Sequence, residues 1–116
     1  MFEDYQRTKN LERNDCGADE DQAKQYQTST DNLIDLIYDW GRDKGLHDAD
    51  PARQVIKLGE EFCELQAAFL RNSWPDFTDA VGDMIVVLVN LCAQMGLDLN
   101  YCIQQAWDTI KGKMAR

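Results

Sequence analysis

Two groups of acidic residues stand out in the middle of this chain. The first is residues 59–64, GEEFCE, and the second is residues 79–83, DAVGD, which runs directly into an apolar stretch. Acids at the mouth of an apolar helix are costly to bury unless something pairs with them. A divalent cation is the usual partner when several acids converge without an equal set of bases. The pattern therefore predicts a site for Mg²⁺, with Mn²⁺ as a substitute ion.

The first group is predicted to form one polar strip along a helix. Residues three, four and seven apart in a helix share a face. The strip consists of Lys57, Glu60, Glu61 and Glu64, with Gln54 one turn earlier on the same side. Such a strip taken alone is more often a solvated surface than a site, so its significance depends on the second group.

The second group contributes Asp79 and Asp83, four residues apart, and Asn90, seven residues after Asp83. The loop between the two predicted helices is short, so we expect them to run antiparallel with their acids facing each other. Magnesium bridges protein carboxylates to phosphates and lowers the pKa of an attacking water. The residues thus favour chemistry on a polyphosphate, with Lys57 balancing the acids at rest. Asn90 alone is more often a residue that hydrogen-bonds between helices.

Length and charge exclude several other classes of protein. A chain of 116 residues is normally one domain, and its net charge of −9 argues against a nucleic-acid partner, which needs a basic face. No stretch reaches the roughly 18 to 20 apolar residues of a membrane span, and the first residues lack the features of a signal peptide. We therefore expect a cytoplasmic protein with no membrane partner.

Cysteine and histidine usage excludes two kinds of metal site. The four cysteines form no C-x-x-C pair, and the single histidine is His47, which we expect in a solvated loop. A tetrahedral zinc site is therefore not expected. A carboxylate-bridged di-iron bundle needs Glu-x-x-His on two helices and is rejected for the same reason.

Helix signals divide the chain into an arm and one all-α domain. Residues 1–28 contain one Leu and no Ile or Val, which predicts a polar arm that cannot hold itself in place. Residues 29–116 predict four helices, at about 30–44, 51–72, 75–96 and 98–112. Ser29 or Thr30 can cap the first, and Asp50 followed by Pro51 is a well-formed start for the second.

Apolar residues at helical spacing predict which faces are buried. The predicted inner stripes are Leu33, Leu36, Ile37 and Trp40 on the first helix, Val55, Leu58, Phe62, Leu65 and Phe69 on the second, and Leu99, Ile103, Ala106 and Ile110 on the fourth. The third helix is apolar nearly all round over residues 84–92 and must be covered on every side. Three short neighbours cannot do this, so we expect a homodimer or homotetramer.

The acidic motifs also carry a family resemblance. E-E-x-x-E, followed on the next helix by G-D and an apolar run with V-N-L, resembles the MazG-like all-α nucleoside triphosphate pyrophosphohydrolases, above all their short phage-carried members. The resemblance covers about residues 31–114. It implies a four-helix bundle completed by dimerisation or tetramerisation. It also implies Mg²⁺-dependent cleavage of nucleoside or deoxynucleoside triphosphates, or related nucleotides, to the monophosphate and pyrophosphate.

The resemblance assigns metal ligands residue by residue. Glu61 and Glu64 match the first pair of ligands, and Asp83 matches the Asp of the second motif, E-x-x-D. The Glu expected three residues before that Asp is Ala80 here, which is a departure from the pattern. Asp79, one residue earlier, could supply the missing oxygen. Ala80 also leaves a second interpretation open, in which the protein is a catalytically weak module that senses nucleotides or binds a partner.

The same comparison implies roles around the metal. Glu60 or Glu61 would orient the attacking water, and Asn90 would contact the nucleotide. Further candidates for substrate contact are Gln54, Lys57, Trp40, Lys111 and Lys113. Lys111 and Lys113 equally fit a basic C-terminal helix turn that opposes the helix dipole. A tryptophan such as Trp40 is more often an anchor within a helix bundle.

Overall fold

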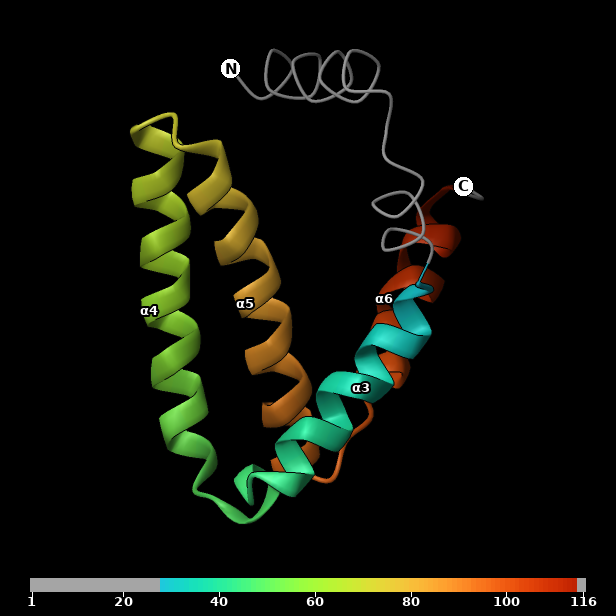
Figure 1. Cartoon of the computed structure of the whole chain (residues 1–116). Helices are drawn as coiled ribbons and strands as arrows, with labels where there is room; N and C mark the ends of the chain where they lie inside the picture. Colours follow the sequence, from blue (N-terminus) through green and yellow to red (C-terminus); the bar gives the residue numbers. More distant parts are fainter. Residues whose placement is uncertain (1–27, 115–116) are drawn as a thin grey trace.

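The computed structural model describes residues 28–114, and this part of the chain is built from helices without a strand (Figure 1). The elements in order are α3 (Thr30–Asp43), the short 3₁₀ helix η1 (Leu46–Asp48), α4 (Pro51–Leu70), α5 (Trp74–Gln94) and α6 (Leu99–Met114). The predicted all-α class and the four helices are confirmed. The predicted polar arm, residues 1–28, falls almost wholly outside the described residues.

Helices α4 and α5 form an antiparallel hairpin, which is the main packed unit of the chain (Figure 1). The start of α4 follows the sequence signal, because Asp50 Oδ1 accepts a hydrogen bond of 3.0 Å from the Ala52 N–H and a proline opens the first turn. Residues 71–73 connect the helices. Asn72 adopts a left-handed φ of 57°, which lets the chain reverse at once.

Helix α3 and η1 pack against α5, toward its C-terminal half. The Ser29 side chain caps α3 by accepting from the Asn32 N–H at 3.2 Å, and Gly45 ends the helix region with a φ of 74°. Gln94 Nε2 donates a 2.8 Å hydrogen bond to the Leu46 carbonyl and so ties η1 to α5. These contacts hold α3 across one end of the α4–α5 hairpin.

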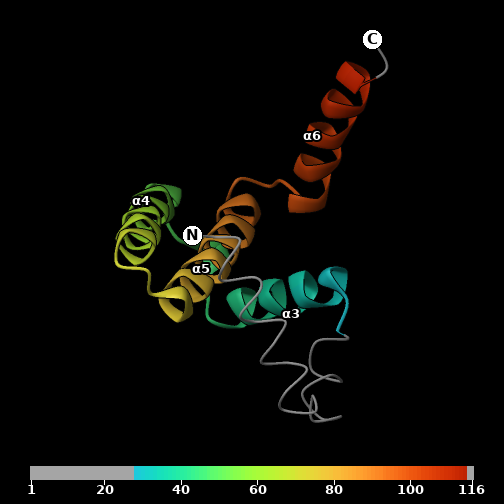
Figure 2. The same ribbon diagram turned by 90° about the horizontal axis from the view of Figure 1, so that it is seen from above.

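Helix α6 departs from the predicted bundle. It follows a turn at Gly96, with a φ of 70°, and Asp98 Oδ1 accepts a 2.9 Å hydrogen bond from the Asn100 N–H at its start. Viewed from above, α6 extends away from the other helices (Figure 2). It contacts chiefly the end of α5, and none of its described residues is buried. The inner face predicted for the fourth helix is therefore not covered by the residues that the structure describes.

The buried residues also differ from the predicted stripes on α3 and α4. On α3 the buried residues are Ile34 and Gly41, while three of the four predicted stripe residues, Leu33, Leu36 and Trp40, are exposed. On α4 the buried residues are Glu61 and Ala68, and Val55 and Phe62 of the predicted stripe are exposed. The physical reason is that a broad apolar face meets a neighbour along only one edge, and within one chain that edge belongs to α5.

Helix α5 is the most covered element, as its apolar character requires. Its buried residues are Ala80, Val87, Val89 and Asn90. No single helix in the part of the chain that the structure describes has the length and apolar character needed to cross a membrane. Only α5 and α6 taken together, with a bend of 107° between them, reach that length and composition.

Candidate metal centre and phosphate groove

Three carboxylates meet between α4 and α5. Glu61, Glu64 and Asp83 each offer an oxygen, and these oxygens lie within 4.8 Å of one another. The antiparallel hairpin makes this possible, because Glu61 and Glu64 share one face of α4 and Asp83 approaches from α5. Oxygen ligands at this spacing suit Mg²⁺ or Mn²⁺. The structure thus brings together three of the four predicted metal ligands.

Glu61 is the most unusual member of this cluster. Only 7% of its surface is exposed, and its Oε2 atom is buried without a hydrogen-bond partner among the described residues. Its Oε1 atom lies 3.6 Å from Lys57 Nζ, whose side chain is half exposed. A buried carboxylate that is only partly paired costs stability unless a further positive charge reaches it. The orphaned oxygen therefore fits a cation held by the cluster.

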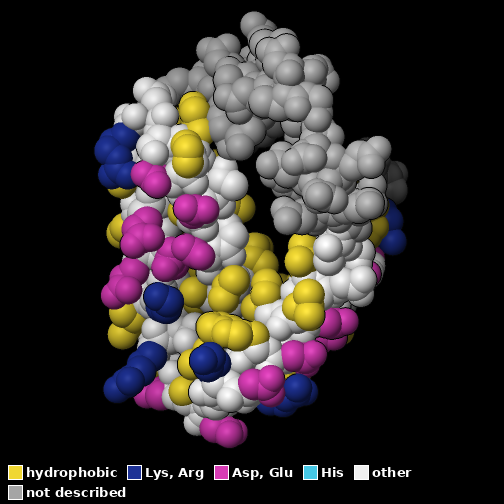
Figure 3. All heavy atoms as spheres, in the orientation of Figure 1, with side chains coloured by type: hydrophobic (Ala, Val, Ile, Leu, Met, Phe, Trp, Pro, Cys, Tyr) yellow, Lys and Arg dark blue, Asp and Glu magenta, His cyan; other side chains and the backbone are white. Residues whose placement is uncertain are grey.

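A groove of about 310 Å³ continues from the cluster toward the α4–α5 connection. It is lined by Glu64, Ala67, Arg71, Asp76, Asp79, Ala80 and Asp83. Asp79 lines this groove but is not a member of the three-carboxylate cluster. Figure 3 shows acidic side chains gathered over α4 and its side facing α5. The groove is therefore acidic, and a phosphate could enter it only with cations present.

The other predicted residues of α4 lie beside the cluster. Lys57 is part of the site through its ion pair with Glu61. Gln54 is half-buried one turn before Lys57, and Glu60 is exposed next to Glu61. Neither Gln54 nor Glu60 lines the groove.

Asn90 lies under α3, away from the groove. It is 2% exposed, and its Nδ2 atom donates a 3.0 Å hydrogen bond to the Val86 carbonyl. Its Oδ1 atom has no partner among the described residues and lies so close to Gly41 that a Cβ there would overlap it. Asn90 is therefore buried against α3, but its hydrogen bond lies within α5 and not between helices.

Three predicted substrate contacts are not brought to the groove within one chain. Trp40 is exposed on α3, and Lys111 and Lys113 lie in the last turns of α6. Lys111 Nζ instead lies 3.3 Å from Asp108 Oδ1 on its own helix.

His47 differs from the expectation of a solvated loop residue. It is half-buried and its ring lies 4.4 Å from the Tyr38 ring, centroid to centroid. Its Nε2 atom is buried without a partner among the described residues. The reason is that η1 folds back onto α3 and α5, which a short sequence of loop type does not reveal.

Arg71 is the groove residue that sequence reasoning missed. It caps the end of α4, and its Nη2 atom donates a 3.4 Å hydrogen bond to Asp76 Oδ2. The signal was available, because Arg71 stands seven residues after Glu64 just as Lys57 stands seven residues before it. Residues at that spacing share a helix face.

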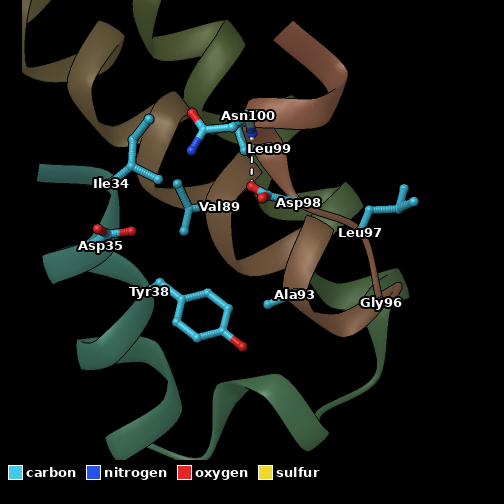
Figure 4. A pocket seen from close by; sticks show the side chains of 10 residues that line it. All are labelled: Ile34, Asp35, Tyr38, Val89, Ala93, Gly96, Leu97, Asp98, Leu99 and Asn100. Carbon is cyan, nitrogen blue, oxygen red and sulfur yellow. Dashed lines mark hydrogen bonds between the residues drawn. The ribbon is translucent and has the colours of Figure 1, made fainter. Parts of the chain in front are cut away.

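A second cavity of about 450 Å³ lies between α3, the end of α5 and the start of α6 (Figure 4). Its walls combine apolar side chains such as Ile34 and Val89 with Asp35, Tyr38 and Asp98. None of the predicted site residues lines it. One of its carboxylates, Asp98, is already used to cap α6.

Comparison with known proteins agrees with the all-α fold. The family model for phosphoribosyl-ATP pyrophosphohydrolase (PRA-PH) matches residues 43–108, which include both acidic motifs and more than half of the chain. An "uncharacterized 18.2 kDa protein in rep-hol intergenic region" of Haemophilus phage HP1 (strain HP1c1) is 40% identical over 67 residues. That match covers 57% of this chain and 41% of the phage protein. This chain thus spans about two fifths of the length of that relative.

No solved structure matches the chain. The family match confirms the all-α pyrophosphohydrolase superfamily to which the acidic motifs pointed, and the relative comes from a phage, as the resemblance suggested. On the extent of the matched segment, the chain belongs to the phosphoribosyl-ATP pyrophosphohydrolase family.

Proposed function

We propose that this protein is a Mg²⁺-dependent nucleotide pyrophosphohydrolase of the short MazG-like type. It would cleave nucleoside or deoxynucleoside triphosphates, or related nucleotides, to the monophosphate and pyrophosphate in the host cytoplasm. The observation that carries this proposal is the buried, unpartnered Oε2 of Glu61 within the cluster that Glu64 and Asp83 complete. A buried carboxylate beside two further carboxylates costs stability unless cations join them.

In this proposal Glu61, Glu64 and Asp83 would hold the ion, and Asp79 on the groove wall would add a further oxygen. When bound, Mg²⁺ neutralises phosphate charge and lowers the pKa of the attacking water. Glu60 or Glu61 would orient that water and accept its proton. Water attacks the phosphorus next to the nucleoside, the anhydride bond breaks, and pyrophosphate leaves with the bonding electrons.

The other predicted substrate contacts remain part of the proposal, but each would reach the nucleotide under a different condition. Lys57 would exchange its ion pair with Glu61 for a phosphate oxygen once cations balance the acids. Trp40, Lys111 and Lys113 could reach a nucleotide only in a groove formed with a second copy of the chain. The packed position of Asn90 makes its contact with nucleotide the least supported of these roles.

The direct test is pyrophosphate release from a panel of nucleoside triphosphates with Mg²⁺. We expect wild type to release pyrophosphate and Glu61→Ala and Asp83→Ala to lose most of this activity. Asp43→Ala is the matched control, since Asp43 is an exposed acid at the end of α3 that pairs with Arg42 and does not line the groove. Absence of release by wild type, or equal rates in all three variants, would contradict the proposal.

A second candidate is a module that binds nucleotides without turning them over. One observation favours it: Ala80, where the resemblance expects Glu, is 2% exposed and offers no oxygen. Calorimetric titration with nucleotide and Mg²⁺ separates the two candidates. Binding that depends on Glu61 without pyrophosphate release would select the sensing module.

We also propose that the protein assembles as a homodimer or homotetramer. Large apolar side chains remain exposed on several helices, including Val55 and Phe62 on α4 and Ile85 on α5. Leu65, Phe69, Leu70 and Phe77 line an apolar groove of about 350 Å³ beside them. Contiguous apolar surface of this kind marks an interaction site. Sedimentation should show an assembly that Phe62→Asp converts to folded monomer, and a monomeric wild type at high concentration would contradict the proposal.

A further inference from the structure

The groove has an uneven distribution of charge along its length. Arg71 is the basic residue among the seven that line it, and it stands at the end that meets the α4–α5 connection. Glu64 and Asp83 belong both to the groove and to the carboxylate cluster, so groove and cluster are continuous. A molecule held at the cluster could therefore extend along the groove as far as Arg71.

Two basic residues flank the cluster on the same face of α4. Lys57 precedes Glu64 by seven residues and Arg71 follows it by seven, which places each about 10 Å from Glu64 along the helix axis. Lys57 and Arg71 differ in the burial of their ion-pair partners. Lys57 is paired with Glu61, which is buried, whereas Arg71 is paired at 3.4 Å with the exposed Asp76.

The Arg71–Asp76 ion pair can separate at little cost in stability. Both side chains are about 60% exposed, and exposed ion pairs contribute little to stability. Asp76 Oδ2 also accepts a 2.7 Å hydrogen bond from Ser73 Oγ, so the carboxylate stays satisfied when the guanidinium leaves it. A guanidinium binds phosphate through paired, charge-assisted hydrogen bonds, which are stronger than such a surface pair.

The ends of the groove also differ in their surroundings. The start of α4 lies toward α3 and η1, whereas the end of α4 meets the short connection to α5 (Figure 1). The carboxylate cluster therefore lies between the α3 side of the hairpin and Arg71, so a phosphate tail that reaches Arg71 leaves the nucleoside on the α3 side of the cluster. The Arg71 end offers the basic residue of the groove, and the exposed Leu70 stands next to it on α4.

We propose that Arg71 binds the terminal phosphates of the substrate, so that the nucleotide lies with its nucleoside toward α3 and its leaving pyrophosphate toward the α4–α5 connection. This inference rests on the proposed pyrophosphohydrolase activity and adds an orientation to it. Arg71 exchanges Asp76 for the phosphate tail on binding. It then holds pyrophosphate after the anhydride bond breaks, which makes it a determinant of product release.

The test is product inhibition of the full chain by inorganic pyrophosphate and, separately, by the nucleoside monophosphate, at fixed free Mg²⁺. We compare wild type, Arg71→Gln, Arg71→Lys and the control Arg42→Gln. Arg42 is an equally exposed arginine paired with Asp39 and Asp43, and it does not line the groove. Arg71→Gln should raise the inhibition constant for pyrophosphate about tenfold, as loss of a charge-assisted contact predicts, and leave that for the monophosphate unchanged. Arg71→Lys should fall between, and the control should match wild type.

Three results would overturn the inference. They are an unchanged pyrophosphate constant in Arg71→Gln, an equal rise for both products, and an equal rise in the Arg42→Gln control. Failure of the proposed function is seen separately, as absence of turnover in wild type. In that case, calorimetric titration of wild type and Arg71→Gln with inorganic pyrophosphate and Mg²⁺ still tests whether Arg71 binds pyrophosphate. Retained helical circular dichroism in each variant excludes unfolding as the cause.

Discussion

Replacing Glu61 by Gln should stabilise the metal-free protein while removing its response to Mg²⁺. The carboxylate is 7% exposed, its Oε2 atom has no partner in the described structure, and its other oxygen meets only the half-exposed Lys57 at 3.6 Å. The substitution keeps the shape of the side chain and removes a buried charge. Glu61 is therefore expected to destabilise the metal-free protein and to stabilise the metal-bound protein.

The magnitude follows from the burial of this group. A neutral polar group buried without its partner costs about 1–3 kcal/mol, and an uncompensated buried charge costs more, so exchanging the carboxylate for an amide lowers the cost without removing it. The Lys57 ion pair that the substitution gives up is worth well under 1 kcal/mol, because the ammonium is largely in water. The net gain for metal-free Glu61→Gln is then about 1 kcal/mol, or roughly 4 °C in Tm for a domain of this size. Wild type should gain about 2.7 kcal/mol at a Mg²⁺ concentration one hundred times its Kd.

Thermal and urea denaturation with and without Mg²⁺, at one protein concentration, measures both effects. Glu64→Gln is the matched control, because Glu64 is an exposed member of the same cluster. It should lose the Mg²⁺ response without any gain in the metal-free state. The reasoning is refuted if metal-free Glu61→Gln is less stable than wild type, or if it retains the full response to Mg²⁺.

Two further predictions concern packing and thiol reactivity. Gly41→Ala should lower the free energy of unfolding by about 1–3 kcal/mol in urea denaturation, because the new Cβ would overlap Asn90 Oδ1, whereas Gly112→Ala, which has open space, should gain up to about 1 kcal/mol. Burial, the neighbouring Cys102 thiol and Asp98 raise the pKa of the Cys92 thiol, so iodoacetamide at pH 8 should alkylate Cys92 more slowly than the exposed Cys63, as peptide mass spectrometry would show. Faster alkylation of Cys92, or a stabilising Gly41→Ala, would contradict the packing described.

The sequence predicted those parts of the fold that local chemistry decides. Asp50 with Pro51 marks the start of α4, and Gly45 marks the end of the α3 region, because caps and positive φ values depend on a few neighbouring residues. The pairing of the two acidic motifs was also predictable. A connection of three residues between long helices leaves an antiparallel hairpin as the one arrangement that fits.

What the sequence could not predict is which edge of each broad apolar face is buried. Ile34 and Gly41 are covered on α3 because α5 approaches that side, and no local signal distinguishes this edge from the one that carries Leu36. For the same reason, the sequence did not predict that Glu61 is buried or that Arg71 lines the groove. Both depend on how closely α4 and α5 approach each other, which is a property of the packed pair.

The departure at Ala80 follows from that close approach. Ala68 and Ala80 are 1% and 2% exposed, and α4 makes its main contacts with α5, so two small side chains are buried where these helices pack. Small residues let helices approach closely, and the approach is what brings the Glu64 and Asp83 oxygens within 4.8 Å. Ala80 also lines the groove, so a longer side chain at position 80 would take up groove space next to Asp83. Asp79, exposed on the groove wall, is the neighbouring position from which a carboxylate can turn toward the cluster without separating the helices.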